Sequence, residues 1–247
     1  MSTAPATDKA QPPRAAGDFL NRLRIGGITP FSTVDWPGQL AVVLFLQGCP
    51  WRCAYCHNND LQGACGNGRN DWAEVERLLA QRRGLVDGVV FSGGEPTAQL
   101  EITAAVQRVK ELGFAVGLHT AGVYPRRLAE MLPYLDWIAL DVKALPEDYD
   151  QLTGVPGSRE RVDEALELLL KSDKPFECRT TVDWSLLPPA ALARLGERLA
   201  RLGVQDFAVQ IARAVGTHYH PGTLYEDSGE VLAHLATLFP RFALRPG

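Results

Sequence analysis

Short apolar runs alternate with amphipathic segments over most of this chain. Residues 41–46 are apolar at every position, which is typical of a strand that is covered on both faces in a parallel sheet. Residues 71–83 differ, because Trp72 and Val75 recur at helical spacing behind Asp71, a residue that can cap the first turn. The pattern therefore predicts a buried strand followed by an amphipathic helix.

The same alternation continues toward the C-terminal end. The predicted strands cover residues 41–46, 88–92, 114–119, 136–143, 176–182 and 206–211. The predicted helices cover residues 71–83, 96–112, 124–132, 159–171, 189–202 and 229–238. Repeated strand–helix units with short loops predict a parallel sheet with right-handed crossovers. About six units indicate an α/β fold in the form of a partial (β/α)6 barrel with outer helices, because a closed barrel needs eight.

The N-terminal end has a different composition. Residues 1–18 are rich in alanine, proline and small polar residues. We interpret residues 1–22 as a disordered leader and expect a single domain over residues 23–247. The segment 24–40 is rich in turn-forming residues, and we expect it to be an irregular lead-in to the first strand.

The overall composition narrows the function classes. The chain is 46% hydrophobic and 22% charged, as in an ordinary globular protein, and its formal net charge is −4. No block of lysine and arginine stands out, which argues against nucleic acid or a membrane surface as a partner. The longest apolar run is too short to span a membrane, and we see no export signal, so we expect a cytoplasmic protein.

Three of the five cysteines lie in one short loop after the first predicted strand. Cys49, Cys53 and Cys56 follow the spacing CxxxCxxC, which brings three thiolates close enough together to hold one compact metal centre. A [4Fe–4S] cluster usually takes four thiolates, one for each iron. Three thiolates leave one iron without a protein ligand, and an open coordination position is typical of catalytic metal sites.

Zinc is the main alternative occupant, with His57 as a fourth ligand. His57 is adjacent to Cys56, however, and neighbouring residues on a tight loop rarely reach one tetrahedral ion together. Structural zinc sites often draw two ligands from each of two short loops, and no second CxxC is present. A disulfide framework fits less well, because the number of cysteines is odd and a chain of this length can build a core without cross-links.

The second predicted strand ends in a glycine-rich segment, Ser92-Gly-Gly-Glu-Pro96. Gly93 and Gly94 would let the backbone approach a ligand closely, and Glu95 could face an ammonium group. Alone, the segment could be a simple turn before a helix. Its position one strand–helix unit after the cysteine loop favours a ligand site, because ligands of such folds bind at the carboxyl ends of the strands.

Further polar residues lie at the ends of the next strands. Asp141 and Lys143 share one face of their strand by alternation, where they could meet a ligand or form a simple ion pair. Arg179 suits a contact with a carboxylate or a ribose. Thr120 and the backbone beside it could meet a ligand, whereas the adjacent His119 could equally be a core or rim histidine.

Taken together, these segments resemble the radical S-adenosylmethionine (SAM) superfamily, in which the methionine part of SAM chelates the open iron of a [4Fe–4S] cluster. The matching segments are RIGGITPFSTVDWPG, CPWRCAYCHN, FSGGEP, LDVKA, LTGVPGS and CRTTV, within residues 24–211. The resemblance implies that Cys49, Cys53 and Cys56 hold the cluster and that SAM is the cosubstrate. Domains of this superfamily are commonly partial barrels of six units, which agrees with the pattern.

The resemblance extends to the other candidate residues. Those expected to bind SAM are Tyr55, Asn58, Gly93, Gly94, Glu95, Thr120 and Arg179. Tyr55 would pack against the adenine, although alone it could be an ordinary half-buried aromatic residue. Asp141 and Lys143 are the expected catalytic pair, with the lysine near the carboxylate of SAM. His119 stands where relatives often carry an acidic residue, which puts any cation site using that acid in doubt.

Within the superfamily, the chain most resembles the activating proteins of glycyl-radical enzymes, especially the group for anaerobic ribonucleoside-triphosphate reductase. This resemblance implies an oxidoreductase that removes a hydrogen atom from a backbone glycine of a partner enzyme. It also implies a low-potential electron donor such as flavodoxin or ferredoxin. Two alternatives stay open: a small-molecule radical SAM enzyme similar to 7-carboxy-7-deazaguanine synthase, and a non-catalytic zinc-binding module.

Overall fold

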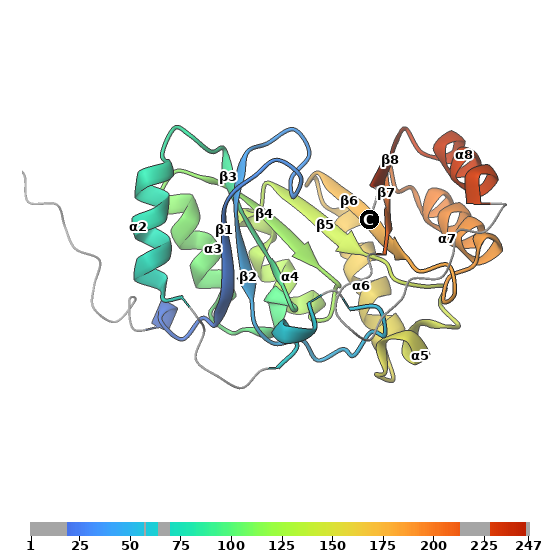
Figure 1. The fold of residues 1–247 in the computed structure, drawn as a ribbon, viewed down its shortest axis with the longest axis horizontal. Helices are drawn as coiled ribbons and strands as arrows, with labels where there is room; N and C mark the ends of the chain where they lie inside the picture. Colours follow the sequence, from blue (N-terminus) through green and yellow to red (C-terminus); the bar gives the residue numbers. More distant parts are fainter. Residues whose placement is uncertain (1–18, 57, 64–69, 213–227, 246–247) are drawn as a thin grey trace, which may run out of the picture.

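The computed structural model describes residues 19–56, 58–63, 70–212 and 228–245, and within them eight strands form one sheet in the order β1 to β8 (Figure 1). The strands are β1 (Ile25–Ser32), β2 (Ala41–Leu46), β3 (Gly88–Gly93), β4 (Ala115–Thr120), β5 (Trp137–Asp141), β6 (Phe176–Val182), β7 (Asp206–Ile211) and β8 (Arg241–Arg245). The α-helices are α2 (Trp72–Arg82), α3 (Ile102–Glu111), α4 (Pro125–Met131), α5 (Tyr149–Thr153), α6 (Ser158–Lys171), α7 (Pro189–Leu202) and α8 (Ser228–Leu238). Three short 3-10 turns are η1 (Asn59–Leu61), η2 (Pro96–Ala98) and η3 (Leu132–Tyr134).

Parallel pairing dominates the sheet. In the described part of the chain, strands β2 to β8 pair in parallel, and β1 alone runs antiparallel to its neighbour. All six predicted strands are present as β2 to β7, and the bounds of β2, β6 and β7 are those expected. Helices connect successive parallel strands along the sheet (Figure 1). The α/β class and the partial barrel are therefore confirmed.

The helix predicted over residues 96–112 is confirmed only in its C-terminal part. The structure divides residues 96–112 into the turn η2 and the helix α3. The break includes Gln99, whose backbone is extended and whose side-chain amide bonds to backbone groups of Arg24 and Gln47. These bonds hold Gln99 out of the helix, and they join segments too distant in sequence for a local pattern to reveal.

The expectation of an irregular lead-in over residues 24–40 is also wrong in part. Its first half forms β1, an edge strand in which Pro30 is tolerated because the outer side of the strand has no ladder partner for an N–H group. The other edge strand, β8, and the five-residue helix α5 were not predicted either. All three are short or lack a clean apolar period, so hydropathy alone cannot distinguish them from loops.

The predicted leader lies mostly outside the described residues, which begin at residue 19. Leu20 and Leu23 pack in the main hydrophobic core. The boundary between leader and domain stays a prediction. In the described part of the chain, no helix combines the length and apolar character needed to cross a membrane. The expected cytoplasmic location also stays a prediction.

A tryptophan fills the amino-terminal end of the barrel interior. Trp36, from the loop between β1 and β2, stacks on Trp137 of β5 with ring centroids 5.7 Å apart. Gly88 and Gly117 make room for the ring, since a Cβ atom at either position would lie 2.8 or 3.0 Å from it. Trp36 is 7% exposed and packs with Val43 and other inward-facing side chains. It therefore forms a plug beneath the polar part of the barrel.

Replacing Trp36 with alanine should lower the free energy of unfolding by about 3–5 kcal/mol, because a buried ring and its stacked partner lose their contacts. Urea unfolding followed by circular dichroism would measure the change. The matched control is Phe31→Ala, which removes an aromatic ring that is 50% exposed. Comparable losses in the two variants would contradict the assignment of Trp36 as the plug.

Candidate active site

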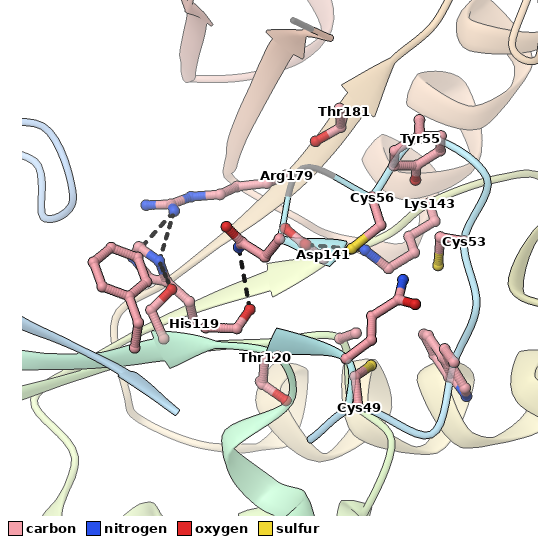
Figure 2. A pocket seen from close by; sticks show the side chains of 18 of the residues that line it. Cys49, Cys53, Tyr55, Cys56, His119, Thr120, Asp141, Lys143, Arg179 and Thr181 are labelled. Atoms are coloured by element: carbon pink, nitrogen blue, oxygen red, sulfur yellow. Dashed lines mark hydrogen bonds and ion pairs between the residues drawn. The ribbon is translucent and has the colours of Figure 1, made fainter. Parts of the chain in front are cut away.

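One cavity of about 400 Å³ contains nearly all the predicted site residues (Figure 2). Those that line it are Cys49, Cys53, Tyr55, Cys56, Asn58, Gly93, Gly94, Thr120, Asp141, Lys143 and Arg179. They come from the carboxyl ends of β2 to β6, where parallel strands bring their loops together. Glu95 is the exception, because it is fully buried behind the wall. The cavity brings the candidates together, and their individual roles stay predictions.

The cysteine loop is held by backbone hydrogen bonds from neighbouring segments. The N–H groups of Gly48 and Cys49 donate to the carbonyls of Leu61 and Gln62, at 2.7 and 3.2 Å. The Arg52 side chain donates to the Cys49 carbonyl at 2.5 Å. These bonds fix the path of the loop while its three cysteines remain partly exposed and unbridged. Figure 2 shows their sulfur atoms on the same side of the cavity as the Lys143 ammonium group.

The cysteines provide soft donors in a poorly solvated place. Burial raises the pKa of Cys49 to about 12 and also raises the pKa of Cys53, although the Lys143 ammonium opposes both shifts. Both residues are therefore neutral thiols when no metal is bound. A bound metal would deprotonate them, because a coordinating thiolate is stabilised by the positive charge. Among the described residues, no three Cys, His, Asp or Glu side chains are placed to hold a metal ion. His57 and Cys65 lie outside the described residues.

Gly93, the last residue of β3, and Gly94 after it are required by backbone packing. Gly93 has a φ of +112°, and a Cβ atom there would collide with the backbone of Leu46. A Cβ atom on Gly94 would lie 2.5 Å from the Gly48 carbonyl oxygen. The Asn58 side chain also donates to the Gly93 carbonyl at 3.3 Å. The glycine segment therefore packs directly against the start of the cysteine loop, in addition to facing the cavity.

Glu95 has protein partners where we expected an ammonium group. Its carboxylate accepts hydrogen bonds from the backbone and side chain of Thr97, from the Thr120 hydroxyl at 2.7 Å and from the Ala121 N–H at 2.8 Å. Burial raises the pKa of Glu95, although these donors favour its ionised form. The structure thus shows Glu95 joining the ends of β3 and β4, and direct binding of SAM by its side chain stays a prediction.

Asp141 and Lys143 form an ion pair inside the cavity. The Lys143 ammonium lies 3.1 Å from the Asp141 carboxylate and 5.9 Å from the centre of the Tyr55 ring. Burial tends to lower the pKa of Lys143, but Asp141 and other neighbours raise it above the usual value overall. The lysine therefore stays charged, with an ammonium group that can receive an anionic group of a ligand.

The opposite wall carries a second polar group. Arg179 is 5% exposed, stacks over Trp137 at 5.0 Å and donates to Glu177 at 2.5 Å. Its guanidinium also lies 3.1 Å from Nε2 of His119, and His119 contacts the Asp35 carbonyl through the same nitrogen at 2.7 Å. Burial lowers the pKa of Arg179, and Glu177 opposes that shift.

His119 is held in its neutral form. Nε2 lies against the Asp35 carbonyl, which can only accept, so Nε2 carries the proton and Nδ1 accepts from Ser92 at 3.2 Å. Burial lowers the pKa of His119 well below 6.5, and the positive charges of Arg179 and Arg245 lower it further. This histidine belongs to the rim of the cavity, which was one of the two interpretations left open.

Asp35 and Trp51 are among the cavity residues that sequence reasoning missed. Asp35 precedes Trp36 in the loop between β1 and β2, and this loop starts at the opposite end of the barrel. Only the fold therefore reveals that Asp35 reaches the cavity. Trp51 lies between Cys49 and Cys53 in the sequence, is 1% exposed and lines the cavity. Tyr55 was predicted, and its buried hydroxyl has no hydrogen-bond partner in the described part of the protein. An unpaired buried hydroxyl on the cavity wall fits a site that receives a polar ligand.

Comparison with protein families and curated proteins gives consistent matches. A family model described as the radical SAM superfamily matches residues 43–183. A Methanocaldococcus jannaschii protein named as a candidate glycyl-radical enzyme activating enzyme is 31% identical over 167 residues, which cover 64% of this chain and 67% of that protein. The pyruvate formate-lyase-activating enzyme of Clostridium pasteurianum is 35% identical over 137 residues, or 53% of this chain and 57% of the enzyme.

A solved structure shares the fold at low sequence identity. Streptococcus suis SuiB bound to S-adenosylmethionine superposes with a TM-score of 0.60 and 17% identity, over 81% of this chain and 48% of SuiB. At this identity the likeness concerns the fold. The present chain spans 57 to 67% of the length of the two curated relatives.

Replacing Glu95 with glutamine should destabilise the protein by about 1–3 kcal/mol, because an amide nitrogen cannot accept from the N–H groups that now bond to the carboxylate. Urea unfolding at pH 8 would measure this loss. The control is Glu130→Gln, on the exposed face of α4. Equal stability of the two variants would show that one acceptor oxygen at position 95 is enough.

The neutral state of His119 predicts a pH dependence. The folded pKa of His119 lies below the unfolded value of about 6.5. The neutral ring therefore stabilises the folded state above that pH, and this contribution is lost as the pH falls. Between pH 7.5 and 5.5 the wild type should lose about 1.4 kcal/mol more unfolding free energy than His119→Gln. The comparison with the variant cancels the other titrating groups. Parallel pH profiles would mean that the folded protein accepts a protonated His119.

Proposed function

The chain belongs to the radical SAM superfamily, and we propose that it is an activating enzyme that generates a glycyl radical on a partner protein. The observation that carries this proposal is the gathering of Cys49, Cys53 and Cys56 in one cavity with the Gly93–Gly94 segment and the Asp141–Lys143 pair. The names of the two curated relatives support the activating role. The finer identification of the partner as anaerobic ribonucleoside-triphosphate reductase rests on the sequence resemblance.

The residues present fit a [4Fe–4S] cluster and SAM. Although the three thiols are not grouped around one metal ion, a cluster takes one thiolate at each iron, so three thiols suit a cluster with one open iron. They share a cavity within the size range of small-molecule sites. The unpaired Tyr55 hydroxyl and the charged Lys143 ammonium offer polar contacts to a cosubstrate with amino, carboxylate and hydroxyl groups. When bound, the cluster and SAM together supply a one-electron reductive cleavage that produces a hydrogen-abstracting adenosyl radical.

The chain's own groups have separable tasks in this proposal. Cys49, Cys53 and Cys56 hold the cluster on the side of the cavity where the Lys143 ammonium group lies (Figure 2). Lys143 binds the carboxylate of SAM, and Asp141 keeps the ammonium oriented through the 3.1 Å ion pair. The Gly93–Gly94 backbone packs against the start of the cysteine loop, and the Asn58 side chain bonds to Gly93. Thr120 and Arg179 line the cavity from β4 and β6, and their proposed task is to meet the ribose of SAM.

The partner is proposed to insert a glycine-bearing loop into the cavity from the carboxyl ends of the strands. A glycine has no side chain to obstruct the approach of its Cα hydrogen, which suits a site surrounded by Trp51, Tyr55 and Phe45. The required electron would come from a low-potential donor such as flavodoxin or ferredoxin. A small-molecule substrate would use the same residues, so the two functions must be separated by experiment.

Anaerobic reconstitution with iron and sulfide tests the proposal directly. The wild-type protein, once reduced and given SAM, should form 5′-deoxyadenosine, and Cys53→Ala should reduce that formation to the uncatalysed background because one thiolate ligand is lost. The matched control is Cys178→Ala, since Cys178 is buried in the core away from the cavity and should retain activity. Chromatography of the nucleoside products measures the outcome.

The partner is tested in the same preparation. Adding a glycyl-radical enzyme should produce a protein-based radical signal in electron paramagnetic resonance, and a partner with its radical glycine changed to alanine should not. A colourless protein that contains zinc, lacks acid-labile sulfide and forms no 5′-deoxyadenosine would contradict the enzyme and favour a zinc-binding module. Cleavage of SAM coupled only to a small molecule would contradict the activating role while leaving the radical chemistry intact.

A further inference from the structure

The short helix α5 follows β5 in the chain and lies beside the cysteine loop (Figure 1). Its first residue, Tyr149, is 1% exposed and is one of the largest fully buried side chains. The sequence patterns predicted no helix here, and the function proposed above gives α5 no task. Its contacts nevertheless join both halves of the site.

The end of β5 is bonded on one side only. Beyond the last strand residue, the Val142 N–H donates to the Arg179 carbonyl at 2.8 Å, and the Thr180 hydroxyl donates to the Val142 carbonyl at 2.7 Å. In a parallel sheet, the adjoining Asp141 carbonyl and Lys143 N–H point to the other side, toward β4. The paired part of β4 ends at Thr120, opposite Leu140, so β4 offers these two groups no further ladder.

The Tyr149 hydroxyl takes the place of the missing strand. It accepts a hydrogen bond from the Lys143 N–H at 3.0 Å and donates to the Asp141 carbonyl at 3.3 Å. Burial raises the pKa of Tyr149, so the hydroxyl keeps the proton that it donates. One hydroxyl therefore fixes the backbone on both sides of Val142, and this backbone carries the Asp141 and Lys143 side chains into the cavity.

The same helix also supports the cysteine loop. The Trp51 ring meets the Tyr149 ring edge-on, with centroids 5.9 Å apart, and is itself 1% exposed. The Arg52 N–H donates to the Thr153 carbonyl at 2.8 Å, and the Thr153 hydroxyl bonds to the Tyr149 carbonyl at 3.0 Å. Tyr149 thus lies between the loop that carries the thiols and the strand end that carries the ion pair.

We propose that Tyr149 is a positioning residue for SAM, which holds the Lys143 ammonium at a fixed place relative to the cysteine loop. This inference rests on the proposed function, since the ligand in question is its cosubstrate. Tyr149 does not line the cavity itself and acts through Lys143 and Asp141. Without the hydroxyl, the segment after β5 keeps its bonds to β6 but loses those on the β4 side, so the ammonium samples several positions.

Tyr149→Phe removes the hydroxyl and leaves the ring to pack against Trp51. The matched control is Tyr134→Phe, the same change in the turn η3, which precedes β5 at the opposite end of the strand. Amide hydrogen exchange, read by mass spectrometry on the full-length protein, should show faster exchange in peptides covering residues 141–148 for Tyr149→Phe only. Unchanged exchange there would overturn the hydroxyl bridge whether or not the proposed activating function is correct.

Equilibrium dialysis of the reconstituted, unreduced holoprotein against labelled SAM supplies the functional readout. Tyr149→Phe should raise the dissociation constant about tenfold, the loss expected when a hydrogen bond to a buried group is removed. Iron and sulfide content should equal those of the wild type and of Tyr134→Phe. In turnover, KM for SAM should rise more than kcat falls.

The alternatives give different results. An unchanged dissociation constant would overturn the positioning role. Equal losses of iron and of SAM affinity would also overturn it, because Tyr149 would then support only the fold of the cysteine loop. A wild-type holoprotein that binds no SAM would overturn the proposed function together with this inference, whereas the exchange measurement would still report whether the hydroxyl bond exists.

Discussion

Two backbone segments touch at the ends of β2 and β3, and the geometry of the cavity depends on that contact. The Gly94 N–H donates to the Leu46 carbonyl at 2.8 Å, and the Glu95 N–H donates to the Gly48 carbonyl at 2.9 Å. Such an approach is possible only because neither Gly93 nor Gly94 has a Cβ atom. The contact fixes where the cysteine loop leaves the sheet. The Glu95 carboxylate also accepts hydrogen bonds from Thr120 and Ala121 at the end of β4, so the ends of β2, β3 and β4 are held together.

The charged side chains described below form ion pairs inside the barrel, and the cavity still has hydrogen-bond donors that can contact a ligand. Glu177 accepts from Arg179 and from Arg245 of β8, at 2.5 and 2.8 Å, which ties the edge strand to the lumen. Asp141 neutralises Lys143 without enclosing it. Buried ion pairs add little net stability, since desolvation offsets most of the attraction. Their value here is orientation, because an unpaired arginine at this depth would instead draw in water, and an unpaired lysine would draw in water or lose its proton.

The sequence predicted the parts of this structure that repeat. Strands that are apolar on both faces, such as β2, have a pattern that survives without tertiary context, and parallel order then places their carboxyl ends at one edge. From that order, the sequence alone predicts that Cys49, Gly93 and Asp141 lie at the same edge of the sheet. It could not find β1, β8 or α5, because short or edge elements owe their structure to partners distant in the chain. The break at Gln99 has the same cause.

The role of Glu95 shows where a resemblance and a physical account diverge. The motif suggests a carboxylate that meets an ammonium group, yet in this chain both oxygens are bonded to Thr97, Thr120 and Ala121. A side chain that locks the glycine segment in place would be constrained in sequence as strongly as one that touches ligand. The glycine segment lines the cavity at this wall, and Glu95 determines its position. The same logic applies to Tyr149, which makes its contacts with backbone groups just outside the cavity. In this fold, the residues that shape the site are as specific as the residues that line it.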